Sequence, residues 1–472
     1  TNAFEEIKDT FDSKNLLNPG KIVRPYKSDD RSLMRYKSNY KSEDIKTNYD
    51  WSEWGNFSDA IEMCNNNGAC RKLDSGVMCP SYRVTKEEKD LVRGRANTLR
   101  LALSNQLPRD SFVSKEMYET MELCVSCKAC KRECPMSVDM AKMKSEFLFH
   151  YYKKFSMSIK DRVISNMPKL IWLLKIVSPI FNKIKNLPLI SDVIRKFGYA
   201  TEREMPTVQN QFPLKEIYKS QIKSENKVIL FADTFNINFE IQNLMYSIKV
   251  LNKFGFEVII PSFDNDKLKR PLCCGRTYIS YGQLDKAEKE LNRFVNYILV
   301  NGYYEMPIVG IEPSCLLTFS DEFKTLKNVK NRDKLKNKFY LLEEFVLEQI
   351  NKGNNVSLNK FDQDVLIHGH CHQKSQDRIK GLTGLLSKLN INNKMIDSSC
   401  CGMAGSFGYN SKNYDVSKKM ANLSLIPAVN ESTDKDFIVA NGTSCRHQIS
   451  DLSEKKAKHI SELLFKIFET VN

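Results

Sequence analysis

The stretch C-V-S-C-K-A-C-K-R-E-C-P, residues 124–135, decides the fold of the first half of the chain. Its cysteines follow the spacing C-x2-C-x2-C-x3-C-P, in which a tight loop aims three sulfurs at one iron–sulfur cluster while the fourth ligates a second cluster. Structural zinc sites instead show two separated cysteine pairs. The spacing therefore predicts iron–sulfur ligation, with Cys124, Cys127 and Cys130 on one cluster and Cys134 on another.

An upstream run supplies the remaining ligands. Cys79 would complete the cluster of the three-cysteine loop, whereas Cys64 and Cys70 would join Cys134 and give only three thiolates. Asn67, in C-N-N-N-G-A-C, stands at the missing fourth position. An amide is a poor iron ligand beside sulfide. Three outcomes stay open for this site: a 4Fe-4S cluster with one non-cysteine ligand, a 3Fe-4S cluster, or a ligand borrowed from elsewhere.

An internal duplication follows between residues 227 and 455. K-V-I-L-F-A-D-T-F (227–235) matches D-V-L-I-H-G-H-C-H (364–372), and both copies continue to Cys-Cys-Gly and then to a further strand and cysteine. Strands that alternate with helices predict a parallel α/β sheet in each copy. Each cysteine group falls just past a predicted strand, and ligands gather at the carboxyl ends of the strands in such sheets.

The second copy carries the fuller set of metal donors. Its cysteines are Cys371, Cys400, Cys401 and Cys445, with His368, His370 and His372 close by. This set suffices for a further iron–sulfur cluster or for zinc, with the histidines supporting the site around Cys371. The first copy has Cys273, Cys274 and Cys315, but Thr234 stands where the second has Cys371. Its site is therefore weaker, and inert buried cysteines or a site shared between the copies stay open.

Local signals predict several helix boundaries. Thr85 and Glu88 have the spacing of a capping box for a helix that follows them. Asp139 is placed to cap a helix whose Met140 and Phe147 share one face. Residues 155–226 mix apolar and basic side chains, and their prolines, Pro168, Pro179 and Pro188, predict short helical pieces. This segment reads either as helices packed on the protein or as an interfacial helix with Trp172, Leu173 and Ile176 in acidic lipid.

Composition limits the functional classes. The chain has 472 residues, 41% of them hydrophobic and 27% charged, without an apolar run that could span a membrane or a signal peptide. Fourteen cysteines in a long chain without a secretion signal favour metal ligation in a reducing cytoplasm over disulfides. A formal charge of +15 suggests an anionic partner, and a solubilising surface explains it equally well. The start at Thr1 suggests a processed or excised piece.

Two longer stretches carry a family resemblance. G-V-M-C-P-S-Y-R-V-T-K-E-E-K-D-L-V-R-G-R-A-N-T-L-R (76–100) and M-E-L-C-V-S-C-K-A-C-K-R-E-C-P-M-S-V-D-M-A-K-M-K (121–144) resemble the iron–sulfur half of FAD-linked 2-hydroxyacid dehydrogenases. Such enzymes act on D-lactate, D-2-hydroxyglutarate or glycolate. The two Cys-Cys-Gly copies are similar to the cysteine-rich domains of the glycolate oxidase iron–sulfur subunit, anaerobic glycerol-3-phosphate dehydrogenase and heterodisulfide reductase. The first 24 residues look like the tail of an FAD-linked oxidase domain.

The resemblance implies a mixed fold, in which an α-helical two-cluster ferredoxin-like domain precedes two duplicated α/β cysteine-rich domains. The predicted organisation is an oxidase-domain tail (1–24), a linker (25–55), a 4Fe-4S ferredoxin-type domain (56–154), a basic-apolar helical connector (155–226) and two cysteine-rich domains, which we name copy one (227–350) and copy two (351–472). FAD would lie on an upstream domain, so no FAD-binding or catalytic residue is assigned in this chain.

The implied function is electron transfer from reduced flavin to a quinone or other respiratory acceptor. Expected partners are the FAD-linked oxidase domain or subunit, the acceptor, and a membrane surface contacted through residues 155–200; no nucleic acid is expected. The expected location is cytoplasmic, with peripheral contact at the inner face of the cytoplasmic membrane. Two alternatives remain: a heterodisulfide-reductase-like enzyme with its catalytic cluster in the cysteine-rich domains, and a zinc-binding protein without redox activity.

Overall fold

The structure is a computed structural model of the chain. It describes residues 2–34, 39–74, 76–185, 187–209, 217, 221–261, 270–354 and 356–468, apart from the side chains of Leu33 and residues 172–175. The chain forms two compact units, Thr1–Glu43 and Asp44–Asn472.

The first unit contains the helix α1 (Asn2–Phe11) and the 3-10 helix η1 (Arg31–Leu33). Asp12 closes the end of α1, because its carboxylate accepts hydrogen bonds from the backbone N–H groups of Leu16 and Leu17, both at 2.8 Å. Lys8 pairs with the same carboxylate at 2.5 Å. The start of this unit is thus a short helix followed by a turn.

The second unit begins with a helical region that holds seven of the cysteines. Its elements are η2 (Ser52–Trp54), α2 (Phe57–Glu62), η3 (Ala69–Arg71), α3 (Pro80–Thr85), η4 (Glu88–Asp90), α4 (Val92–Leu103), η5 (Ser111–Val113), α5 (Lys115–Glu122), α6 (Ala129–Glu133) and α7 (Met140–Lys154). Asp139 caps α7 by accepting the N–H of Lys142, and Met140 and Phe147 are buried, as predicted. The capping box at Thr85 is wrong, because Thr85 is the last residue of α3 and the next α-helix begins only at Val92.

Three helices follow: α8 (Ile159–Ser165), α9 (Met167–Ile184) and α10 (Pro188–Lys196). Pro168 and Pro188 lie in the first turns of α9 and α10, where no backbone N–H is needed. Pro179 lies inside α9, which continues through it, so the prediction that Pro179 breaks the helix is wrong. The side chains of Trp172 and Leu173 lie outside the described part of the structure.

The two copies form two parallel sheets in which three strands follow the same order, and the sheet of copy one has a fourth strand. In copy one the order is β2 (Glu257–Ile259), β1 (Lys227–Phe231), β3 (Ile308–Gly310) and β4 (Phe339–Leu341). In copy two it is β6 (Asn393–Met395), β5 (Asp364–His368) and β7 (Asp436–Ala440). All pairings are parallel, which confirms the predicted fold class.

Helices surround both sheets. In copy one they are α12 (Thr234–Asn238), α13 (Ile241–Lys253), α14 (Arg276–Ser280), α15 (Leu284–Val300), η6 (Tyr303–Glu305), α16 (Pro313–Ser320), α17 (Glu322–Thr325), η7 (Arg332–Leu335) and α18 (Leu342–Asn351). In copy two they are α19 (Cys371–Ser375), α20 (Ile379–Lys388), η8 (Phe407–Tyr409), η9 (Ser411–Asn413), α21 (Tyr414–Asn422), α22 (Leu425–Glu431), α23 (Thr443–Leu452) and α24 (Ile460–Phe468).

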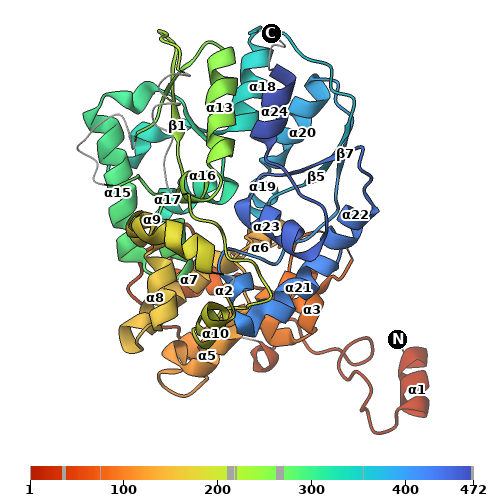
Figure 1. Cartoon of the computed structure of the whole chain (residues 1–472). Coiled ribbons are helices and arrows are strands. Elements are labelled where there is room, and N and C mark those ends of the chain that lie inside the picture. Colours follow the sequence, from red (N-terminus) through yellow and green to blue (C-terminus); the bar gives the residue numbers. More distant parts are fainter. Residues whose placement is uncertain are drawn as a thin grey trace. The chain divides into compact units, whose positions relative to one another are not determined.

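The two sheets share one apolar core. Figure 1 shows α13, α18, α20 and α24 between β1 and the strands β5 and β7. Val228 and Leu230 of β1 and Val365 and Ile367 of β5 all face this core. Successive side chains of a strand point to opposite faces, so Ile229 lies in a second core that includes the cysteine-bearing helical region. The opposite faces of the sheets therefore pack against that region.

Residues 44–55 also pack into the second unit. Tyr49 is fully buried and forms an antiparallel bridge with Leu326, while Trp51 is 3% exposed. The backbone N–H of Asn48 donates to the buried carboxylate of Glu146 at 2.9 Å. The last part of the predicted linker thus contributes aromatic side chains to the core. The other proposed boundaries stay predictions.

Candidate iron–sulfur and metal sites

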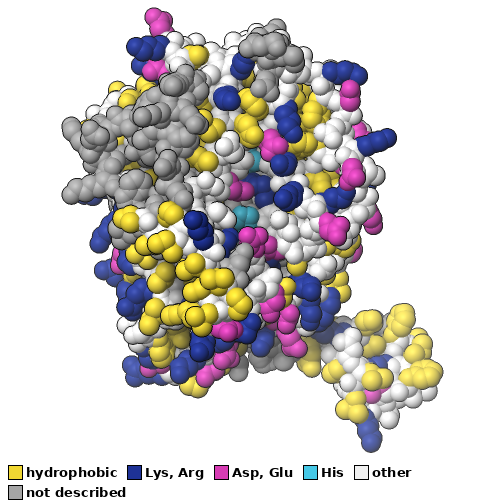
Figure 2. Space-filling model, in the orientation of Figure 1, with side chains coloured by type: hydrophobic (Ala, Val, Ile, Leu, Met, Phe, Trp, Pro, Cys, Tyr) yellow, Lys and Arg dark blue, Asp and Glu magenta, His cyan; other side chains and the backbone are white. Residues whose placement is uncertain are grey.

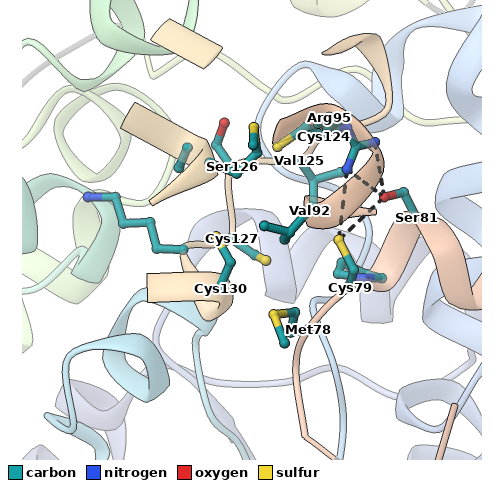
Figure 3. Close-up of a pocket in the computed structure, with 14 residues that line it drawn as sticks. Met78, Cys79, Ser81, Val92, Arg95, Cys124, Val125, Ser126, Cys127 and Cys130 are labelled. Carbon is teal, nitrogen blue, oxygen red and sulfur yellow. Dashed lines mark hydrogen bonds between the residues drawn. The ribbon is translucent and has the colours of Figure 1, made fainter. Parts of the chain in front are cut away.

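Four of the predicted cluster ligands line one cavity, which Figure 3 shows. Cys79 lies directly before α3, Cys130 lies in α6, and Cys124 and Cys127 belong to the loop between α5 and α6. Met78, Val92 and Met140 supply apolar lining. The structure therefore brings the upstream Cys79 into the same cavity as the three-cysteine loop, and these four donors fit a 4Fe-4S cluster.

The thiols in this cavity influence one another. Burial, and then the carboxylate of Asp139 and the thiols of Cys124 and Cys79, raise the pKa of Cys130 well above its usual value. Burial also raises the pKa of Cys79, and the guanidinium of Arg95 opposes it. Burial thus holds protons on these thiols, and a metal that binds here displaces those protons.

Arg95 is a buried cation that the sequence interpretation missed. Its side chain is fully buried; it donates to Ser81 Oγ at 3.3 Å and to Cys79 Sγ at 3.8 Å (Figure 3). Asp90 balances its charge at 3.6 Å. A fixed positive charge beside a thiolate stabilises the anionic form. The only sequence signal was its position in α4, the second α-helix after Cys79.

The second predicted cluster site lies at the loop between α2 and α3. Burial raises the pKa of Cys70 to about 11. The thiols of Cys79 and Cys64 also act to raise this pKa, and a hydrogen bond from the N–H of Arg93 acts to lower it. Cys134 directly follows α6, whose last residue, Glu133, accepts the backbone N–H groups of residues 77 and 78 at 2.7 and 3.1 Å. Cys134 is thus held beside the loop between Cys70 and Cys79. The set of three thiolates stays a prediction.

Asn67 is exposed and bonded within its own loop. Its Oδ1 accepts the N–H of Ala69 at 2.8 Å, and its Nδ2 donates to Asn65 Oδ1 at 2.6 Å. The residue that lies near a sulfur is Asn66, whose Oδ1 is 3.8 Å from Cys64 Sγ and accepts Asn97 Nδ2 at 2.7 Å. Asn67 therefore stabilises the loop turn in this structure.

Replacing Asn67 with cysteine is expected to alter the EPR signal of the cluster at Cys64, Cys70 and Cys134 and to leave the other signal unchanged. A thiolate at this position adds a fourth sulfur donor where the loop lacks one. Asn67→Ala is the matched control, because it removes the same loop hydrogen bonds without adding a donor. Equal spectral changes in the two variants would show that residue 67 acts only through the loop.

The four cysteines of copy two come together at the carboxyl end of their sheet. Cys371 begins α19 after β5, Cys400 and Cys401 follow β6, and Cys445 lies in α23 after β7. A hydrogen bond from Cys400 lowers the pKa of Cys371 to about 7, and hydrogen bonds from Cys400 and Cys445, together with the neighbouring imidazole of His368, lower the pKa of Cys401 well below its usual value. Four thiols in mutual contact are suitable donors for iron–sulfur or zinc.

The backbone closes tightly around this group. A Cβ atom at Gly442 would lie 2.4 Å from His370 Cδ2 and 3.2 Å from Cys445 Sγ. Only glycine fits there without displacing the ring. Gly402, after the cysteine pair, has a φ of +82° and would meet the backbone oxygen of Ser417 at 2.4 Å. These glycines allow the loops at the ends of β6 and β7 to approach the cysteines.

The three cysteines of copy one lie together, and copy one has no fourth cysteine. A hydrogen bond to Cys274, together with burial, raises the pKa of Cys273, and Cys274 and Cys315 are hydrogen-bonded neighbours. Backbone N–H groups that follow the pair reach Cys273 Sγ and Cys274 Sγ, both at 3.4 Å. Thr234 begins α12 at the place where Cys371 begins α19. The structure thus reproduces the arrangement with one donor fewer, and a metal there stays a prediction.

The ferredoxin-type cysteines and copy two are neighbours. Burial, and then the thiols of Cys371 and Cys79, raise the pKa of Cys127 well above its usual value. His372 Nε2 lies 3.1 Å from the carbonyl oxygen of Ser126, in the loop that carries Cys127. Helix α6 packs against α19 (Figure 1). Arg132 pairs with Asp377 at 2.9 Å. The cysteine group of copy two therefore lies beside the four-cysteine cavity.

Lys128 connects the same loop to copy one and was missed in the sequence. Its side chain is 1% exposed, and its Nζ lies 2.8 Å from Asp321 Oδ2 and 2.6 Å from Glu322 Oε2. Glu322 also pairs with Arg276 at 2.5 Å, and the N–H of Arg276 reaches Cys274 Sγ. A chain of charged contacts thus links the cavity to the cysteines of copy one. A lysine between two ligand cysteines was the available signal.

Known proteins match both cysteine regions. A family model of the 4Fe-4S dicluster domain matches residues 60–138, and a model of the cysteine-rich domain matches residues 365–450. The chain is 23% identical over 510 residues to D-2-hydroxyglutarate dehydrogenase of Pseudomonas putida, covering 98% of this chain and 48% of that protein. The corresponding Escherichia coli protein is 22% identical over 518 residues, with coverages of 98% and 49%.

A shorter relative is one of the subunits of the anaerobic glycerol-3-phosphate dehydrogenase of Escherichia coli. It is 26% identical over 253 residues, which cover 53% of this chain and 61% of that protein. The chain thus carries one region similar to the 4Fe-4S dicluster domain and one similar to the cysteine-rich domain. Its similarity to these dehydrogenases agrees with the resemblance described from the sequence. The chain spans about half the length of the D-2-hydroxyglutarate dehydrogenases it matches.

Proposed function

We propose that this chain is the electron-transfer module of an FAD-linked 2-hydroxyacid dehydrogenase. In this proposal, one cluster is held by Cys79, Cys124, Cys127 and Cys130, a second by Cys64, Cys70 and Cys134, and copy two holds a further iron–sulfur or zinc site. Bound clusters supply one-electron transfer between reduced flavin on another domain and a quinone or other respiratory acceptor.

One observation carries the proposal: the cysteine groups form a continuous series. Cys70 and Cys79 lie within electrostatic range of each other, as do Cys127 and Cys371. Cys79 and Cys127 line the same cavity. A module that only stabilised a fold with zinc would not require three donor groups within electrostatic range of one another. The donors near the protein surface, Cys124 and Cys134, are half-buried and offer places where electrons can enter.

The protein residues around the four-cysteine cavity keep it dry and charge-balanced. Met78, Val92 and Met140 exclude water, and Arg95 places a positive charge next to Cys79. Lys144 Nζ donates to the carbonyl oxygen of Cys124 at 2.6 Å, and burial lowers the pKa of Lys144 to about 8. Nearby positive charge and hydrogen-bond donors are among the features that set a cluster's reduction potential.

The test uses the anaerobically purified chain and a reconstituted flavin domain. We expect D-2-hydroxyglutarate or D-lactate to reduce the clusters, seen by EPR, only when the flavin domain is present. Iron and sulfide analysis should give about eight irons per chain with the ferredoxin-type sites filled. Zinc without sulfide contradicts both redox interpretations. Turnover of a heterodisulfide by the chain alone supports the heterodisulfide-reductase alternative instead.

A contact with an anionic membrane surface would bring the module to a quinone. Figure 2 shows hydrophobic side chains gathered over α8, α9 and α10. Ile176, Ile180 and Leu189 are 79%, 66% and 75% exposed. Lysines and arginines on the same helices supply positive charge next to this apolar face. None of the helices in the described part of the chain has the length and apolarity that crossing a membrane requires.

The triple variant Ile176→Glu, Ile180→Glu, Leu189→Glu is expected to bind vesicles of phosphatidylcholine and phosphatidylserine at least about tenfold more weakly than the native chain. Each substitution removes apolar area that would enter the interface and adds repulsion from the lipid charge. Flotation of the vesicles measures the binding of each variant. Val300→Glu is the matched control, since Val300 is 84% exposed on α15. Equal binding of the triple variant and the control contradicts a membrane role for these helices.

A further inference from the structure

His368 ends β5 at the cysteine group of copy two. One of its ring nitrogens and the Sγ atoms of Cys401 and Cys445 all lie within 4.8 Å of one another. The ring is 2% exposed, and within the described part of the chain Nε2 has no hydrogen-bond partner. A buried polar nitrogen without a partner costs free energy unless another group occupies its lone pair. The ring that carries it lies beside the sulfurs of Cys401 and Cys445.

The other ring nitrogen is held in place. Nδ1 lies 2.8 Å from Ser398 Oγ, and Lys374 Nζ donates to the carbonyl oxygen of Ser398 at 2.6 Å and to its Oγ at 3.4 Å. Metal-binding histidines are commonly oriented in this way, by a hydrogen bond at the nitrogen that does not bind the metal. An Nδ1–H that donates to Ser398 leaves the lone pair on Nε2.

Copy one provides an internal comparison. Phe231 occupies the position of His368, since each residue ends the central strand of its sheet and pairs with the end of the neighbouring strand, Gly310 or Ala440. The Phe231 ring packs between Phe294 and Phe319, with centroids 5.5 and 5.3 Å away. Copy one also has Thr234 in place of Cys371. The copy that lacks the fourth thiol therefore also lacks the imidazole.

We propose that His368 is a nitrogen ligand of the metal centre held by the copy-two cysteines, Cys371, Cys400, Cys401 and Cys445. This rests on the part of the proposed function that places a metal in copy two, and is independent of electron transfer. Imidazole binds both iron and zinc. In an iron–sulfur centre, exchanging a charged thiolate for a neutral nitrogen raises the reduction potential. Such a centre in copy two would attract electrons from the neighbouring four-cysteine site.

The test looks for metal–nitrogen coordination in the full chain, purified anaerobically with its own metal. X-ray absorption at the iron and zinc edges identifies the metal and its nitrogen shell, and pulsed EPR of the reduced protein, with natural and ¹⁵N-labelled histidine, detects bound imidazole at a paramagnetic site. We expect nitrogen coordination in the native chain, its loss in His368→Ala, and retention of the metal with an all-sulfur shell in His368→Cys. In His368→Ala the affinity for that metal should fall at least about tenfold.

Matched controls come from the same stretch of sequence. His370→Ala and His372→Ala each remove a ring near the same cysteines, and both should keep the nitrogen signal. A native chain with metal in copy two but without a nitrogen donor would overturn the proposal, as would a nitrogen signal that persists in His368→Ala and His368→Cys. A chain that binds this nitrogen ligand but accepts no electrons from a flavin domain would contradict the proposed function alone.

Discussion

The variant Lys128→Met is expected to lose about 3 kcal/mol of unfolding free energy. The ammonium of Lys128 is buried between the carboxylates of Asp321 and Glu322, which are 4% and 3% exposed. Removing it leaves two buried carboxylates with only their remaining partners, Lys131 and Arg276. Burial acts to raise the pKa of Asp321, but the neighbouring ammonium groups, Lys128 first, hold it well below its usual range. Without Lys128, fewer positive charges oppose the effect of burial on the pKa of Asp321.

Urea unfolding of the reduced, metal-free chain, followed by circular dichroism, measures this loss. The matched control is Lys131→Met. Lys131 pairs with the same carboxylate at 2.7 Å, but its side chain is 40% exposed, so its removal should cost about 1 kcal/mol or less. If the two variants lose equal stability, burial does not distinguish the two lysines and the role assigned to Lys128 is wrong.

The buried positions of Lys128 and Arg95 could not be predicted from the sequence. Lys128 and Asp321 are 193 residues apart, and no periodicity joins them. The spacing of the cysteine run predicted an iron–sulfur region because ligand spacing is a local property of the chain. The pairing of Lys128 with α17, in contrast, depends on how the helical region packs against copy one. Arg95 is a similar case, since its partner Ser81 comes from the preceding helix, and only folding places both beside Cys79.

Local helix signals were reliable only where packing agreed with them. Asp139 caps α7 at the residue where the local signal predicts, and Met140 and Phe147 of this helix bury their side chains in the core. Thr85 carried a similar signal, but Pro80 starts α3 earlier, and Lys86, with a φ of +61°, ends it. Glu88 instead pairs with Arg93 at 2.6 Å. At Pro179 the local signal predicted a helix end, but α9 continues through this residue.

The parallel sheets and their repeated order followed from the duplication, and this in turn placed the cysteines at the strand ends. What the duplication did not reveal is which sites are neighbours. The contact between His372 and Ser126, and the proximity that lets Cys371 raise the pKa of Cys127, arise from the packing of α6 on α19. The proposed order of electron transfer therefore depends on tertiary structure that the cysteine spacing alone does not specify.

The variant Cys79→Ala is expected to lose about four irons per chain and the same EPR signal that Cys127→Ala loses. Although Cys79 lies 45 positions or more before the three-cysteine loop in sequence, it lines the same cavity as Cys124, Cys127 and Cys130. A cubane needs a ligand at each of its four irons, so removing any one of these thiols should empty or convert the same site. The double variant Cys79→Ala, Cys127→Ala should then lose no more iron than either single variant.

Cys134→Ala is the matched control, because Cys134 is the fourth cysteine of the same run but follows α6 beside the loop between Cys70 and Cys79. We expect it to remove the other EPR signal and to keep the one that Cys79→Ala removes. Iron analysis and EPR of the three single variants, purified anaerobically, decide the matter. If Cys127→Ala removes the same signal as Cys134→Ala, and not the one that Cys79→Ala removes, the two runs do not exchange ligands. The cluster that lies within electrostatic range of Cys371 would then have a different set of ligands from the one proposed above.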